Sequence, residues 1–120
     1  MIVYLYVGLG GACGSLVRYI IGKKIAEKTK RIFPLGTLII NISGAFLLGF
    51  INQINFGGSL FLFLTDGFLG AYTTFSTFMY EGFNVFHDKK YLDMAVYIGG
   101  TLLFGLLFYI VGQGLAKAFF

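Results

Sequence analysis

The chain has 120 residues, of which 58% are hydrophobic and only 12% charged, and its mean hydropathy is +0.84. A soluble domain of this size could not bury so large a share of apolar residues, so the composition predicts one integral membrane domain covering residues 1–120. The net charge is +4, and most of the positive charge lies in predicted loops and forms no patch among aromatics, which argues against nucleic acid as a partner. The single cysteine, Cys13, excludes an intrachain disulfide.

Four hydrophobic segments follow one another, at residues 2–22, 34–54, 59–86 and 92–119. Each reaches the roughly 20 residues that a helix needs to cross about 30 Å of hydrocarbon. Backbone groups inside a bilayer must be satisfied within the segment, so these spans are expected to be helices. The predicted fold is therefore an all-α integral membrane protein with four transmembrane helices.

Positive charge is distributed unevenly over the connections between these spans. Apart from Arg18 and Lys117, every Lys or Arg lies in residues 23–33 or 87–91, namely Lys23, Lys24, Lys28, Lys30, Arg31, Lys89 and Lys90. The positive-inside rule places these two loops in the cytoplasm and both termini outside. The charge pattern thus predicts one orientation in the membrane.

Small residues recur at a spacing of four along the spans, which lets helices approach closely. The pairs are Gly10 with Gly14, Ala45 with Gly49, Ala95 with Gly99, and Thr101 with Gly105. Four helices from so short a chain enclose little interior of their own. We therefore expect a pore to form between subunits, in at least a dimer.

The segment GFLGAYTTFSTF, residues 67–78, is unusual for a membrane span because it combines two glycines, four Ser or Thr residues and the pair Phe75 and Phe78, three positions apart. The glycines weaken the helix, and we expect it to unwind over residues 70–74, near the middle of the membrane. A broken membrane helix frees carbonyls that can ligate a cation, and the N-terminus of the following half-helix favours an anion.

Beyond the predicted break, Thr74, Thr77 and Glu81 share one helical face. Phe75 and Phe78 share an adjacent face, and aromatic ring edges carry a positive potential that could stabilise a small anion. Simple core or lipid packing of the two rings is the alternative.

Polar residues on the other spans have two interpretations each. Asn41 must face protein or water, either in a helix–helix hydrogen bond or along a path. Tyr97 and Thr101 form a stripe of hydrogen-bond donors, or ordinary interhelical bonds. Arg18 either extends to the membrane interface or attracts anions to a vestibule. No nucleophile–base pair, Cys/His cluster or phosphate-binding loop is present in the sequence, so we expect no enzyme.

The sequence resembles the Fluc/CrcB fluoride channels over essentially its whole length. The resemblance rests on GGACGSLVRY at residues 10–19, GTLIINISGAFLLG at residues 36–49 and, above all, GFLGAYTTFSTFMYE at residues 67–81. It implies an antiparallel, dual-topology dimer in the cytoplasmic membrane of a prokaryote, surrounded by lipid. Such a dimer would hold two fluoride pores and a structural sodium ion at its centre, and would export fluoride passively.

The resemblance also implies roles for individual residues. Gly70 and Thr73 match the positions whose backbone carbonyls hold sodium, and Arg18 and Glu81 match vestibule positions. The residues implied for the fluoride pore are Asn41, Phe75, Ser76, Thr77, Phe78, Tyr97 and Thr101.

Three positions depart from the family's pattern: Ala71 replaces a glycine at the break, Asp66 replaces a neutral residue, and Gly105 offers no hydroxyl. The charge bias also keeps open a heterodimeric channel in which this chain is one subunit, inactive alone. A small proton-coupled multidrug exporter is a further alternative, but it calls for an acidic residue in the first span, which residues 2–22 lack.

Overall fold

The computed structural model describes residues 1–29, 34–54 and 57–120, and the described chain is almost entirely helical. The helices are α1 (Ile2–Lys28), α2 (Leu35–Ile54), α3 (Gly58–Leu62), the π-helix η1 (Phe63–Leu69), α4 (Gly70–Tyr72), α5 (Phe75–His87) and α6 (Tyr91–Phe119). The helical fold class is confirmed. The first helix is longer than predicted, so Lys23, Lys24 and Lys28 lie on its last turns, whereas Lys30 and Arg31 lie outside the described residues.

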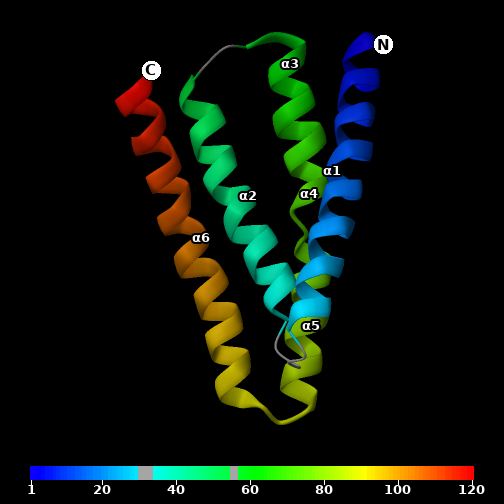
Figure 1. Ribbon diagram of the computed structural model, residues 1–120, viewed down its shortest axis with the longest axis vertical. Coiled ribbons are helices and arrows are strands. Elements are labelled where there is room, and N and C mark those ends of the chain that lie inside the picture. The colour runs from blue at the N-terminus through cyan, green and yellow to red at the C-terminus, as the bar shows by residue number, and fades with distance from the viewer. Residues whose placement is uncertain (30–33, 55–56) are drawn as a thin grey trace.

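The helices run alongside one another in an elongated molecule of 47 × 32 × 23 Å. Figure 1 shows both chain termini at one end, together with the end of α2 and the start of α3. The end of α5 and the start of α6 lie at the opposite end. Helix α2 packs along α6, while α1 packs along η1 and α4, so the third segment lies between α1 and α2 near its middle.

Among the described residues, α1, α2 and α6 are each long and apolar enough to cross a membrane. The segment between α2 and α6 is divided into shorter pieces, as the glycines and hydroxyl residues predicted. The interruption is narrower than expected, however, because Gly70–Tyr72 is helical. Only Thr73 (φ −80°, ψ 156°) and Thr74 (φ −146°, ψ 124°) are extended. The predicted unwinding over residues 70–74 is therefore corrected to these two residues.

Glycines permit close contacts between the helices. A Cβ atom on Gly14 of α1 would collide with the Phe68 carbonyl oxygen of η1, and one on Gly49 of α2 would collide with the Tyr109 carbonyl oxygen of α6. Of the small-residue pairs noted in the sequence, Gly10 with Gly14 is used in this way. Gly99 and Gly105 have open space around them within this chain.

Candidate functional site

The break in the third segment is held by an amide from α2. The Thr74 N–H donates to Asn41 Oδ1 at 2.9 Å, and Asn41 Nδ2 donates to the Thr74 carbonyl at 3.0 Å. The side chain thus satisfies both backbone polar groups of a residue that the helix has released. A hydrogen bond between helices was one of the two interpretations of Asn41 in the sequence. The structure shows such a bond, and its partner is the backbone of Thr74.

The two carbonyls predicted to bind sodium lie at this break. In an uninterrupted α-helix, the Gly70 carbonyl would accept from the N–H of residue 74, and the Thr73 carbonyl from that of residue 77. Here the Thr74 N–H donates to Asn41 Oδ1, and the Thr77 N–H donates to Thr74 Oγ1 at 3.3 Å. Both carbonyls have therefore lost their usual helical donors. Uncharged oxygen ligands of this kind suit a hard monovalent cation, so the residues present fit the expected ion.

The same hydrogen bonds start the second half-helix. Thr74 is the N-cap of α5, and its hydroxyl also lies 3.5 Å from that of Ser76. The N-terminus of α5, with its positive end of the helix dipole, therefore faces the break beside the hydroxyls of Thr74 and Ser76. Anions are favoured at such a position.

Phe75 and Phe78 lie in the first turn of α5 but have different surroundings. Phe78 is 6% exposed, whereas Phe75 is 75% exposed, and their ring centroids are 6.1 Å apart. Phe78 also packs against Tyr97 of α6, at 5.3 Å between ring centroids. The three rings form a continuous series from the protein interior to the surface of this chain.

The stripe on α6 is buried. Tyr97 is fully buried, and the hydroxyl of Thr101, itself 9% exposed, donates to the Tyr97 carbonyl at 2.6 Å. The hydroxyl proton of Thr101 is thus engaged within its own helix, while its oxygen can still accept a hydrogen bond. The structure brings Tyr97 into contact with Phe78, and the polar track stays a prediction.

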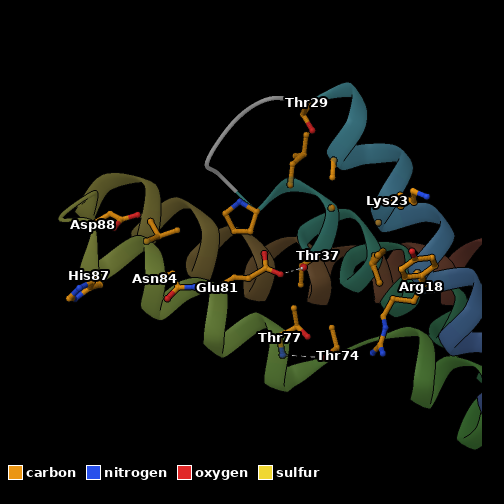
Figure 2. Close-up of a pocket in the computed structure, with 18 residues that line it drawn as sticks. Arg18, Lys23, Thr29, Thr37, Thr74, Thr77, Glu81, Asn84, His87 and Asp88 are labelled. Atoms are coloured by element: carbon orange, nitrogen blue, oxygen red, sulfur yellow. Dashed lines mark hydrogen bonds between the residues drawn. The ribbon is translucent and has the colours of Figure 1, made fainter.

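A cavity of about 800 Å³ leads from one end of the molecule to the break. It is lined by Thr29 and Asp88, which follow α1 and α5, and by Arg18, Thr74 and Glu81. Figure 2 shows the guanidinium of Arg18 directed from α1 toward the region of Thr74. The two residues predicted for a vestibule therefore line the same cavity.

Inside this cavity, Thr37 of α2 donates a hydrogen bond to Glu81 Oε1 of α5 at 2.8 Å (Figure 2). Thr37 was not among the predicted site residues. Its position one turn before Asn41 is the signal that could have identified it, because residues four apart share a helical face. A second contact that the sequence did not indicate joins Ser43 to the Tyr72 hydroxyl at 2.9 Å, next to the break.

The three positions that depart from the family's pattern lie in different settings. Asp66 is exposed on η1 and accepts from the Thr65 hydroxyl at 3.3 Å. Ala71 follows Gly70 in α4, close to Gly11 of α1. Gly105 lies on α6 with open space around it. None of the three lines the cavity.

Three helices that are long and apolar enough to cross a membrane, and a divided segment where hydroxyls, an amide and aromatic rings meet, define a small helical membrane protein. Residues 5–113 match the sequence model of the family described as CrcB-like protein, Camphor Resistance (CrcB). The chain belongs to the CrcB family, which confirms the resemblance found in the sequence.

Curated relatives cover nearly the whole chain. The chain is 54% identical over 114 residues to Fluoride-specific ion channel FluC 2 of Clostridium acetobutylicum, which covers 95% of this chain and 97% of the relative. It is 44% identical over 115 residues to Fluoride-specific ion channel FluC of Hydrogenobaculum sp., covering 92% and 93% of the two chains. It is 37% identical over 124 residues to the protein of the same name from Helicobacter pylori strain J99, covering 98% and 95%. These relatives are named as channels, in agreement with the expectation that the chain is no enzyme.

Proposed function

We propose that this chain forms a fluoride-selective channel that lets fluoride leave the cytoplasm passively and so relieves fluoride toxicity. The observation that carries the proposal is the 54% identity, over nearly the full length of both chains, to a relative named for this activity. The residues at the break add a chemical reason, because they combine hydrogen-bond donors with aromatic ring edges.

Fluoride is small and strongly hydrated, so a path for it must replace water with good hydrogen-bond donors. Thr77 lines the cavity, Ser76 is exposed beside it, and Tyr97 lies on the facing helix. Ring edges of Phe75 and Phe78 would add a weaker positive potential. Several weak sites in series favour conduction, because an ion that binds tightly at one site leaves it slowly.

The proposal includes an antiparallel dimer of four-span subunits with two pores. Its support is that Phe75 and Ser76 begin α5 on the exposed surface of a single chain, where one subunit does not enclose them. In such a dimer, the Gly70 and Thr73 carbonyls of both copies would face a central sodium ion, which would add a fixed positive charge near the anion paths.

A heterodimer is the second candidate, and the charge pattern favours it. Lys23, Lys24 and Lys28 lie on the last turns of α1, and Lys89 and Lys90 lie between α5 and α6. The end of α1 and the connection between α5 and α6 lie in the same half of the molecule (Figure 1). A strongly biased chain inserts in one orientation, so an oppositely biased homologous subunit would be needed to complete an antiparallel pair. In that case this chain alone would not conduct.

The bias also orients the channel within the proposed location, the cytoplasmic membrane of a bacterium. The end with the lysines would face the cytoplasm, and Thr29 and Asp88, which line the cavity together with Arg18, follow α1 and α5 at that end. It would serve as the inner vestibule, where Arg18 and Lys23 attract anions.

The test is fluoride efflux from liposomes reconstituted with the full chain, followed with a fluoride electrode, with chloride efflux as the selectivity control. Selective fluoride efflux from the wild-type chain would support a self-sufficient channel if Phe75→Ile lowers that efflux by at least about tenfold. A tenfold loss corresponds to a change of only about 1.4 kcal/mol in the barrier to conduction. Efflux that appears only with a homologous partner would support the heterodimer. No efflux under either condition from well-folded protein would contradict the proposed function.

A further inference from the structure

We infer that Asn41 is the positioning residue that opens the cation site, and that through it the cation site and the anion path are coupled. The inference rests on the proposed function and deepens it. It states that the side-chain amide of Asn41, on α2, causes the helix to break, together with the glycines of the broken segment itself.

The geometry is a competition for one N–H group. The Thr74 N–H can close the helix by donating to the Gly70 carbonyl, or it can donate to Asn41 Oδ1, and the observed distance of 2.9 Å selects Asn41. The preceding bond of the ladder is intact, because the Thr73 N–H donates to the Leu69 carbonyl at 3.0 Å. The helix thus ends at the residue whose N–H is captured by α2.

The second half of the amide makes the capture stable. Asn41 Nδ2 donates to the Thr74 carbonyl at 3.0 Å, so Thr74 is held in an extended conformation from both sides. The approach of α2 that this requires depends on Gly44, where a Cβ atom would collide with the Thr73 side chain. Without Asn41, the part-buried backbone groups of Thr74 would need new partners, and the Gly70 carbonyl is the acceptor that the Thr74 N–H would have in a continuous helix.

An asparagine amide has two N–H donors, and the structure assigns one of them to Thr74. No group in the described part of the chain is recorded as taking the other one. That N–H can donate to an anion passing the break, while the amide oxygen keeps the Gly70 carbonyl available to a cation. One side chain would therefore act on both ions' sites, and if the cation changes anion binding through it, linkage requires the anion to change cation binding by the same factor.

The experiment separates the two halves of the amide by substitution. Asn41→Ala removes both the acceptor and the donors, whereas Asn41→Asp keeps an oxygen for the Thr74 N–H and removes the NH2 group. The readout for the cation site is the thermal unfolding midpoint of the purified full chain in detergent, in sodium chloride against N-methylglucamine chloride at equal ionic strength. An ion that binds only the folded protein raises this midpoint. Fluoride efflux from liposomes is measured in parallel.

Two matched controls come from the same helix. Ser43→Ala removes the other side-chain hydrogen bond between α2 and the region of the break, without touching Thr74. Asn52→Ala removes the same type of side chain, whose amide donates to the Tyr109 hydroxyl at 3.3 Å far from the break. Both variants should keep the sodium-dependent shift and fluoride efflux.

We expect Asn41→Ala to lose most of the sodium-dependent shift together with efflux, and Asn41→Asp to keep the shift while losing efflux. A folded Asn41→Ala protein with the full shift would overturn the inference.

If Asn41→Ala does not fold, loss of the shift in folded Asn41→Asp would overturn it instead. A wild-type chain that conducts fluoride without any sodium-specific shift would refute the inference and leave the proposed function standing. A last outcome is that the wild-type chain shows a sodium-specific shift that Asn41→Ala loses, but conducts no fluoride either alone or with a homologous partner. That outcome would support the role of Asn41 in the cation site and contradict the proposed channel function.

Discussion

At the scale of single residues, Phe75 and Phe78 of α5 differ in burial although they share one sequence motif. Phe78 is 6% exposed and packs on Tyr97, whereas Phe75 is 75% exposed. Their roles in stability and in conduction should therefore separate. A residue that packs inside the chain contributes to both, and one that lies on its surface contributes to the path with little effect on the fold.

We predict that Phe78→Ala lowers the free energy of unfolding by about 3–5 kcal/mol, because it opens a cavity beside Tyr97. Phe75→Ala should change it far less while still reducing fluoride efflux. Chemical denaturation in mixed micelles and liposome efflux measure the two effects. Equal destabilisation by both substitutions would show that Phe75 is packed as tightly as Phe78 in the assembled protein.

Thr37 provides a second prediction at this scale, because its hydroxyl donates to Glu81 Oε1 at 2.8 Å inside the cavity. Thr37→Val removes the donor and leaves a half-buried carboxylate oxygen without it, which should cost about 1–3 kcal/mol of stability. Thr37→Ser retains the hydroxyl and serves as the control. If the valine variant were as stable as the serine variant, water would already satisfy Glu81.

At the scale of the helices, glycines determine how closely the elements pack. Gly8 and Gly14 lie on the same helix, α1, but only Gly14 lies against η1, where the Phe68 backbone occupies the space of a side chain. A Cβ atom at Gly8 would meet nothing within 4 Å. The pair therefore isolates the effect of close packing from the general effect of replacing glycine in a helix.

We predict that Gly14→Ala destabilises the protein by about 1–3 kcal/mol, because the backbone of η1 must move to admit the methyl group. Gly8→Ala should be neutral or slightly stabilising, since alanine is the better helix former. Thermal unfolding of both variants checks this. A Gly14→Ala protein as stable as the wild type would mean that α1 and η1 separate easily.

At the scale of the whole molecule, the distribution of lysines predicts one orientation of the chain in the membrane. Asp88, which lines the cavity, directly precedes Lys89 and Lys90 in the connection between α5 and α6, and both termini lie at the other end of the molecule. The positive-inside rule then places this connection, with the part of the cavity that Asp88 lines, on the cytoplasmic side. This orientation is testable with single cysteines, because the chain contains only Cys13.

In a Cys13→Ala background, we predict that Lys89→Cys is protected from a membrane-impermeant thiol reagent in intact cells, and that Phe120→Cys is labelled. Disrupted cells should label both positions, which controls for reactivity. Partial labelling of both positions in intact cells would instead indicate that the chain inserts both ways, as a dual-topology homodimer requires.

Much of the fold could be read from hydrophobic length. The second segment was predicted at residues 34–54 and is observed as Leu35–Ile54, and the fourth at 92–119 and is observed as Tyr91–Phe119. These limits are local, because they depend on where apolar residues give way to polar ones. The π-helix Phe63–Leu69 was not predicted. It packs along α1, and such packing between two segments leaves no periodic pattern within one of them.

By itself, the sequence determined the membrane class, the segments and the residues that could form a site, because composition and hydrophobic length act locally along the chain. Only the tertiary structure decided where the third segment breaks. Gly70 is helical and Thr74 is not, because Asn41, 33 positions earlier, captures the Thr74 N–H. The same packing brings Thr37 to Glu81 and Phe78 to Tyr97. Such pairings depend on how helices approach in space, which no periodicity within one segment specifies.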